Sequence, residues 1–192
     1  MWYNCSVFKI VIAPNPALSN IAKPVSKVDT TVIALIEEMK KTLAATTDPK
    51  GVGLAAPQVG KSLRIFIAKP TDESKFLVFI NPEIIEKSAK VDYVKRPKKS
   101  GKKASKKLEG CLSLPNIWGS VLRPSSLTLA YLDERGNSHK QKFSNFLATI
   151  IQHEIDHLDG VLFPKRVLEQ KGTLYKSYKN EKNEDEFEEF EI

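Results

Sequence analysis

The sequence predicts an α+β fold in which antiparallel sheets pack around one buried helix. Segments with the composition of strands precede a late helix, and that helix is apolar on almost every side. A hairpin pattern just before the helix indicates that neighbouring strands pair antiparallel. The chain has 192 residues, of which 41% are hydrophobic and 28% charged, so one domain with a substantial core is expected.

The first half of the chain is expected to contain one helix among short strands. Lys9–Ala13 has the composition of a strand and is followed by Pro14. Asp29 is a suitable N-cap for a helix that continues to about Thr46, because apolar residues recur behind it at helical spacing. Further strands are predicted at Arg64–Ala68, at Lys75–Ile80 and near Glu83–Glu86.

The second half is expected to form a hairpin followed by the buried helix. Ser126–Leu132 alternates as a strand does, Asp133–Asn137 has the composition of a turn, and His139–Phe143 returns. Ser144 is a candidate N-cap for the helix and Gly160 a candidate stop. The large apolar residues of this helix are Phe146, Leu147, Ile150, Ile151, Ile155 and Leu158.

Charge is concentrated in two segments. Residues 95–107 contain eight Lys or Arg and no acid, whereas residues 180–192 contain seven acids and one Lys. The basic segment has no periodicity and is expected to be an exposed loop within a single domain, residues 1–178. Residues 179–192 are expected to be an acidic, disordered tail. The net charge of +7 leaves the body mildly basic, which favours RNA or acidic surfaces as partners.

The sequence predicts a cytoplasmic protein, or one of an organelle interior if the source is a eukaryote. The first residues lack the basic and apolar regions of a secretory signal. No run approaches the roughly 18–20 apolar residues that span a bilayer. Cys5 and Cys111 are too few for a disulfide framework, which leaves Cys111 free to bind a metal in a reducing compartment.

The strongest local signal is formed by His153, Glu154 and His157. Positions i and i+4 share one helix face, so both imidazoles can reach one metal ion, and the adjacent Glu can act on water at that ion. Alternatively, the histidines lie on a partly exposed helix and the acids are solvated charges. The apolar neighbours argue against this alternative, because buried polar groups are costly without a partner.

A catalytic metal site needs a third ligand and an open position. No His follows His157, Asp159 is too close to serve easily, and His139 lies in the predicted hairpin, where a surface role is expected. Cys111, which follows Gly110, is the best remaining candidate. Its alternative role is the commoner one for a lone Cys, a small buried hydrophobe.

Three segments resemble the motifs of the peptide deformylases, in that family's order. They are Gly51–Gln58 (GVGLAAPQ), Glu109–Ser113 (EGCLS) and Gln152–His157 (QHEIDH), and the resemblance extends from about Lys9 to Val167. It implies a metal-dependent hydrolase that removes the N-formyl group from the initiator methionine of newly made polypeptides and releases formate. It also implies one divalent ion, Fe²⁺ in the cell, with Zn²⁺, Ni²⁺ or Co²⁺ also accepted by such ligands.

The resemblance also assigns roles to single residues. Metal-activated water attacks the formyl carbon, and Glu154 serves as general base and then as general acid. The Gln58 side-chain amide and the Leu112 backbone N–H stabilise the oxyanion. The Gly53 backbone runs beside the substrate peptide, as it would beside an added strand. The candidates for substrate binding are Val52, Gly53, Glu109, Arg123, Phe146 and Ile150, and the candidate metal ligands are Cys111, His153 and His157.

Each of these assignments has a structural alternative. Gln58 can satisfy its own loop, and Phe146 and Ile150 can be ordinary core residues. Glu109 and Arg123, taken alone, are more typical of surface charges. Asp156 either orients a neighbouring ligand or faces a basic side chain. Trp118 lies near the expected substrate entrance, at a position where many relatives carry other residues.

The charged segments depart from the family pattern. The Lys-rich insertion is either a solvated loop or a transient contact with the ribosome, since clustered Lys and Arg attract phosphates. The acidic tail argues against docking through a basic C-terminal helix, and neither a membrane nor DNA is an expected partner. Two other functions stay open: a relative that binds metal but cleaves another amide, and a basic RNA-binding protein that happens to carry metal ligands.

Overall fold

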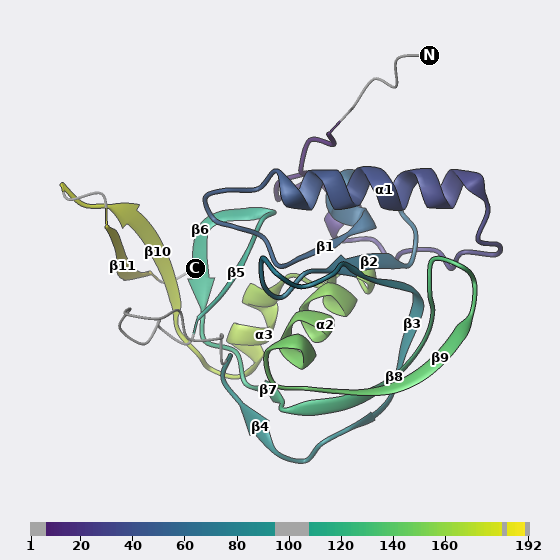
Figure 1. Cartoon of the computed structure of the whole chain (residues 1–192). Coiled ribbons are helices and arrows are strands. Elements are labelled where there is room, and N and C mark those ends of the chain that lie inside the picture. The colour runs from purple at the N-terminus through teal and green to yellow at the C-terminus, as the bar shows by residue number, and fades with distance from the viewer. Residues whose placement is uncertain (1–6, 95–107, 182–183, 191–192) are drawn as a thin grey trace.

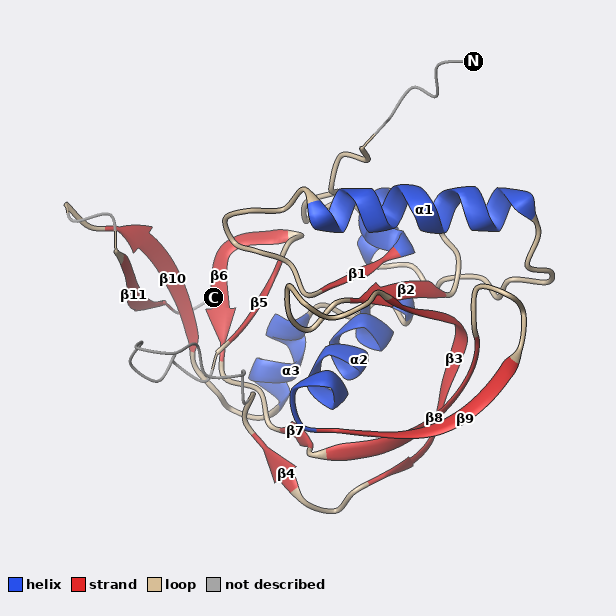
Figure 2. Cartoon of the chain, in the orientation of Figure 1, coloured by secondary structure: helices blue, strands red, loops and turns tan. Residues whose placement is uncertain are grey.

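The computed structural model describes residues 7–94, 108–181 and 184–190. In this part of the chain, α-helices combine with antiparallel sheets (Figures 1 and 2), so the predicted α+β class is confirmed. The predicted basic loop at residues 95–107 lies outside the described residues, as do Cys5 and the last two residues of the tail.

The largest sheet has five strands in the order β1-β2-β3-β8-β9, and each pair is antiparallel. Its strands are β1 (Gly53–Ala55), β2 (Ile65–Ala68), β3 (Leu77–Lys87), β8 (Ser126–Leu132) and β9 (Ser138–Ser144). The hairpin predicted from the alternating pattern is therefore confirmed as β8 and β9. The two strands predicted on either side of Asn81 are one strand, β3, whose register shifts between Ile80 and Glu83.

A second sheet has four strands in the order β11-β10-β6-β5. Its strands are β5 (Glu109–Cys111), β6 (Leu114–Gly119), β10 (Leu174–Lys179) and β11 (Asp185–Phe190). A small ribbon pairs β4 (Val91–Asp92) with β7 (Arg123–Pro124). The helices are α1 (Thr30–Ala44), α2 (Asn145–Leu158) and α3 (Phe163–Glu169), with 3₁₀ turns η1 (Pro16–Leu18) and η2 (Ala56–Val59).

Helices α1 and α2 cover opposite faces of the five-stranded sheet. On β2, Ile65 and Ile67 belong to the core on the α1 side, whereas Phe66 and Ala68 belong to the core on the α2 side. Both sets are buried because successive side chains of a strand point to opposite faces. The sheet is thus the middle layer at this point, which explains why β2 is an unbroken apolar run.

Helix α2 is the centre of the molecule, between the curved five-stranded sheet and the sheet that contains β5 and β6 (Figure 1). Ten of its 14 residues are buried, including Gln152, Glu154, Asp156 and His157. Because buried polar groups need partners, these four residues must be hydrogen-bonded or serve a bound group. The predicted burial of this helix is confirmed.

The ends of the helices follow the predictions in part. The Asp29 side chain accepts hydrogen bonds from the backbone N–H groups of Thr31 and Val32, each 3.0 Å long, so it caps α1 as predicted. The helix ends at Ala44, earlier than the predicted Thr46. Ser144 precedes α2 but makes no capping hydrogen bond through its side chain.

The predicted strand at Lys9–Ala13 is wrong. The backbone N–H of Val11 donates to the carbonyl of Gln58 at 2.8 Å, and that of Ala13 donates to Ser113 at 3.0 Å. These acceptors belong to two different segments, so the stretch has no single partner strand.

The prediction of a disordered tail is wrong for Asp185–Phe190, because these residues form β11 and pair with β10. β10 in turn pairs with β6, so the hairpin continues an existing sheet. Phe190 packs against the core cluster that contains Leu174. The acidic composition suggested disorder. The pairing of these residues depends on a strand elsewhere in the chain, which local composition does not reveal.

Candidate metal centre and substrate pocket

Three potential metal ligands meet between β5 and α2. Cys111 is the last residue of β5, and His153 and His157 lie one turn apart on α2. One ligand atom from each lies within 4.8 Å of the other two, and Cys111 Sγ is 3.1 Å from His157 Nε2. The structure therefore brings together the two histidines of the helix motif and the cysteine 42 residues before the first of them.

This cluster fits a single divalent ion. A thiolate with two imidazoles is a donor set typical of zinc and ferrous iron, and three protein ligands leave a position for water or substrate. The cluster is well shielded, since Cys111 is 6% exposed and His157 is 1% exposed. Within the described residues, Glu154 Oε2 is buried beside it without a hydrogen-bond partner, as expected for a group that serves a bound molecule.

The electrostatics of the site favour the ligating form of the cysteine. Burial alone would raise the pKa of the Cys111 thiol, but the charge of His157 and hydrogen bonds from both histidines lower it to about 5. Burial likewise opposes protonation of His153, yet Cys111 and Glu109 raise its pKa above the ordinary value. The pocket thus stabilises a thiolate beside positive charge, an arrangement that a divalent cation also satisfies.

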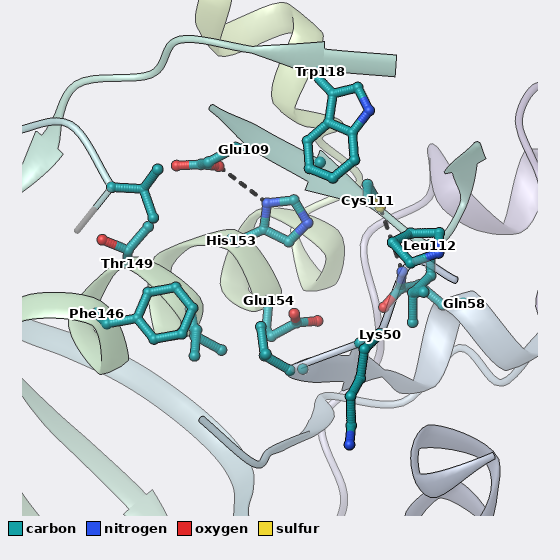
Figure 3. A pocket seen from close by; sticks show the side chains of 17 residues that line it. Lys50, Gln58, Glu109, Cys111, Leu112, Trp118, Phe146, Thr149, His153 and Glu154 are labelled. Atoms are coloured by element: carbon teal, nitrogen blue, oxygen red, sulfur yellow. Dashed lines mark hydrogen bonds and ion pairs between the residues drawn. The ribbon is translucent and has the colours of Figure 1, made fainter. Parts of the chain in front are cut away.

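A chain of hydrogen-bonded residues with alternating charge orients the His153 ring from the side facing away from the metal cluster. Its Nδ1 donates to Glu109 Oε2 at 3.1 Å, as Figure 3 shows. Arg123 binds both carboxylate oxygens of Glu109, at 2.6 and 3.0 Å, and also donates to Asp156 Oδ2 at 2.9 Å. Arg166 donates to Asp156 Oδ1 at 2.8 Å. Asp156 therefore faces two basic side chains, the second of its two predicted alternatives.

Glu154 points into the pocket next to the metal ligands (Figure 3). Burial raises the pKa of its carboxyl to about 7, although the positive charges of His153 and His157 oppose the shift. A Cβ atom on Gly53 would collide with this carboxylate, so the close approach of β1 requires glycine there. A carboxyl group poised near neutrality is suited to accept and return a proton.

Gln58 is buried on the other side of the cluster. Its Oε1 accepts the N–H of Ala55 at 2.9 Å, and its Nε2 donates to Ser113 Oγ at 3.2 Å and to Cys111 Sγ at 3.5 Å. The amide thus satisfies its own loop, as the alternative reading of this residue stated, while its N–H₂ group is turned toward the cluster. Leu112 lies beside it at the pocket wall (Figure 3).

A pocket opens over this centre. Among the predicted site residues, those that line it are Val52, Gly53, Gln58, Glu109, Cys111, Leu112, Phe146, Ile150, His153 and Glu154. His157, whose Nε2 lies 3.1 Å from Cys111 Sγ, is not a lining residue of this pocket. Arg123, predicted to bind substrate, is not a lining residue; it lies behind Glu109, because its guanidinium is needed to neutralise that buried carboxylate.

Several lining residues were missed by sequence reasoning, among them Lys50 and Val94. Lys50 adjoins the motif that begins at Gly51, so proximity to a motif was the available signal. No sequence signal pointed to Val94, because it is far from the three motifs in sequence and only the folded structure brings it to the pocket. Trp118 lines the wall near the predicted entrance.

The chain matches known proteins over most of its length. The sequence pattern of the family described as polypeptide deformylase matches residues 7–172. The chain belongs to the peptide deformylase family. A peptide deformylase of Pseudothermotoga lettingae is 41% identical over 157 residues, which cover 82% of this chain and 81% of the relative.

Solved deformylases share the fold. The crystal structure from Thermotoga maritima has a TM-score of 0.72 and 34% identity, covering 84% of this chain and 97% of that one. A class I type b deformylase from Acinetobacter baumannii, solved with Met-Ala-Ser bound, has a TM-score of 0.72 and 32% identity and is covered over 99% of its length, against 84% of this chain.

This deformylase is therefore an enzyme with a Cys-His-His group that can hold a metal ion. Residues 173–192, which contain β10 and β11, follow the part matched by the family pattern. Within the described ranges, every helix is too short or too polar to cross a bilayer.

Proposed function

We propose that this enzyme hydrolyses the N-formyl group of formyl-methionyl peptides and releases formate, and that its substrates are newly made polypeptides. One observation carries the proposal: Cys111, His153, His157 and Glu154 meet under a pocket bordered by two sheet edges. The bound Met-Ala-Ser of the Acinetobacter baumannii relative is a methionyl peptide of the kind such a reaction produces.

Cys111, His153 and His157 would hold the ion, which we infer to be Fe²⁺ in the cell. When bound, such an ion lowers the pKa of water and polarises a carbonyl oxygen. Zn²⁺, Ni²⁺ and Co²⁺ suit the same donor set, so which ion is bound depends on metal availability in the cell as well as on the ligands. Glu109 orients His153 toward the cluster by accepting the N–H of its other ring nitrogen.

The substrate backbone would bind between β1 and β5. In the described sheets, β1 is the edge strand of one sheet and β5 the edge strand of the other. Gly53 of β1 and Gly110 of β5 both line the pocket. An extended peptide placed between them would form main-chain hydrogen bonds with an edge strand, the mode known as strand addition.

The methionine side chain would enter the apolar part of the pocket. Val52, Phe146 and Ile150 line this part together with Val94. Phe146 and Ile150 lie seven and three residues before His153 on α2, so they share the helix face that carries the metal ligand. This arrangement would set the formyl group next to the cluster once the side chain is seated.

Glu154 would move the proton. Its carboxylate would accept a proton from water and then donate it to the leaving amine nitrogen. The pKa of about 7 matches this double task, because both protonation states are accessible near neutral pH. Gln58 Nε2 and the backbone N–H of Leu112 would donate to the oxygen that becomes negative during attack.

The test compares Glu154→Gln with the unaltered enzyme. The substitution keeps the shape of the side chain against Gly53 but removes its proton-accepting oxygen, so formate release from formyl-Met-Ala-Ser should fall by roughly 10²–10⁴-fold. Metal content after anaerobic purification should be unchanged, because the three ligands stay in place.

Exposed Glu83→Gln is the matched control and should retain full activity. Acetyl-Met-Ala-Ser tests the specificity for formyl, and the enzyme should cleave it far more slowly than the formyl peptide. Full formate release by Glu154→Gln would reject the role of Glu154. Equal rates on the formyl and acetyl peptides would instead support an amidase of different specificity.

A further inference from the structure

Trp118 connects the pocket to the C-terminal hairpin. It lies on β6 and lines the pocket wall, on the opposite side from Lys50 in Figure 3. The hairpin of β10 and β11 lies beside β6 and follows the part of the chain matched by the family pattern.

The indole ring of Trp118 occupies the space over Gly110. The two residues pair across β5 and β6, so their side chains belong to the same face of the sheet. A Cβ atom on Gly110 would lie only 2.6 Å from the indole ring. Because Gly110 has no side chain, the ring reaches across β5 toward the free edge of the sheet.

The hairpin holds this ring from the other side. Trp118 Nε1 donates to Ser177 Oγ of β10 at 2.9 Å. The ring of Phe187 on β11 meets the indole edge to face, with centroids 5.8 Å apart and planes at 75°. Ser177 and Phe187 are direct partners in the hairpin, so both point to the face that carries Trp118. These two contacts orient the ring.

The alternation of strand side chains tells which substrate residue would meet the ring. Glu109 and Gly110 are adjacent on β5, so they point to opposite faces. Glu109 points to α2, where it binds His153, and this is the side of the apolar pocket proposed for methionine. In a peptide strand added beside β5, the next residue would point to the opposite face, where Trp118 lies.

We propose that Trp118, held by Ser177 and Phe187 of the C-terminal hairpin, forms an aromatic subsite for the side chain of the second residue of the substrate. This inference rests on the proposed function, because it takes the peptide to bind between β1 and β5. The ligand class is a formyl-methionyl peptide whose second residue is large and apolar or aromatic. The flat, half-buried indole face offers such a side chain a contact that alanine cannot use.

The experiment measures kcat/KM for formyl-Met-Phe-Ser and formyl-Met-Ala-Ser with the metal-loaded full-length enzyme. The unaltered enzyme should prefer the phenylalanine peptide by on the order of tenfold. The ratio of the two values should fall to about one in Trp118→Ala. It should fall at least about threefold in Phe187→Ala and in Ser177→Ala, because the ring loses a contact that orients it.

Phe190→Ala is the matched control. Phe190 is the same residue type on the same strand as Phe187. It pairs with Leu174, and its side chain points to the other face of the sheet, away from Trp118. It should lower the melting temperature and leave the ratio unchanged, which separates orientation of the ring from stability of the hairpin. Ser177→Ala removes one hydroxyl only, so it tests the idea even if Phe187→Ala does not fold.

Two outcomes are distinguishable. If no variant releases formate from either peptide and the unaltered enzyme also fails, the proposed function is wrong. Formate release from both peptides, with the same kcat/KM ratio in the unaltered enzyme and in the Trp118, Ser177 and Phe187 variants, would instead reject only the aromatic subsite. Binding of the product peptides gives a readout without turnover. Met-Phe-Ser should bind more tightly than Met-Ala-Ser in the unaltered enzyme and in Phe190→Ala, and this difference should disappear in Trp118→Ala.

Discussion

His153 shows how much of the site depends on buried charges that lie behind the metal ligands. Its ring is held by Glu109, Glu109 by Arg123, and Arg123 in turn by Asp156. Burial tends to raise the pKa of Glu109, but the charge of Arg123 and the hydrogen bond from His153 lower it to about 2. The carboxylate therefore stays ionised, and each buried charge in the row has an opposite neighbour, which such charges require.

Replacing Glu109 with Gln should weaken metal binding. His153 would lose the carboxylate that fixes its ring, and Arg123 would lose one of its two buried partners. We expect metal affinity to fall by about 10–100-fold. Competition with a chelator of known affinity measures it, and Arg64→Ala, which breaks an ion pair with Asp159 at the protein surface, is the control. Unchanged affinity in Glu109→Gln would contradict the orienting role.

At the scale of elements, the two strands that border the pocket are short. β1 and β5 have three residues each, and each is an edge strand of its sheet. Short edges limit unwanted pairing with other chains. They still leave main-chain groups next to the pocket, where a single extended peptide can use them.

The turn between β8 and β9 makes stability depend on pH. A hydrogen bond from His139, together with those from Asn137 and from the backbone of Arg135, holds the pKa of Asp133 below its usual range. A lowered pKa means that the folded state favours the ionised carboxylate. The stabilisation is therefore present above the ordinary pKa of about 3.9 and is lost as the pH falls toward the folded value.

Urea unfolding of Asp133→Asn and the unaltered enzyme tests this dependence. At pH 7 the variant should be less stable by at most about 1 kcal/mol, because the turn is partly solvated and its charges are screened. The difference should narrow steadily below about pH 4. A difference that stays constant from pH 7 to acid would show that ionisation of Asp133 does not contribute.

For the whole molecule, the metal cluster joins two parts of the fold. Cys111 belongs to the four-stranded sheet and both histidines belong to α2, which packs on the five-stranded sheet. An ion bound to all three would link these parts in the folded state only. Binding would then stabilise the fold by about 4 kcal/mol when free metal exceeds the dissociation constant 1,000-fold.

Removal of metal should therefore lower the melting temperature. Chelation followed by calorimetry measures the shift, and adding Ni²⁺ or Zn²⁺ back should reverse it. Cys111→Ala, which lacks one ligand, should show little or no response to added metal. If the melting temperature of the unaltered enzyme is the same with and without metal, the cluster does not link the two parts of the fold.

Prediction from sequence succeeded where the signal is local. The Asp29 cap, the hairpin of β8 and β9, and the burial of α2 all follow from periodicity or from residue types a few positions apart. It failed at β11, where composition indicated disorder, and at Lys9–Ala13, where an apolar run has two acceptors from different segments. In both cases the decisive partner lies far away in the chain.

The sequence by itself determined the helix that carries His153, Glu154 and His157 on neighbouring turns, because helical spacing is a property of consecutive residues. The lack of another suitable ligand made Cys111 the candidate for the third ligand, and the resemblance between motifs added Gln58 to the site. Only the tertiary structure decided that β1 and β5 border one pocket, that Arg123 lies behind Glu109, and that the C-terminal hairpin holds Trp118. These arrangements depend on strand pairing and on charge neutralisation between distant residues, which leave no periodic pattern in the sequence.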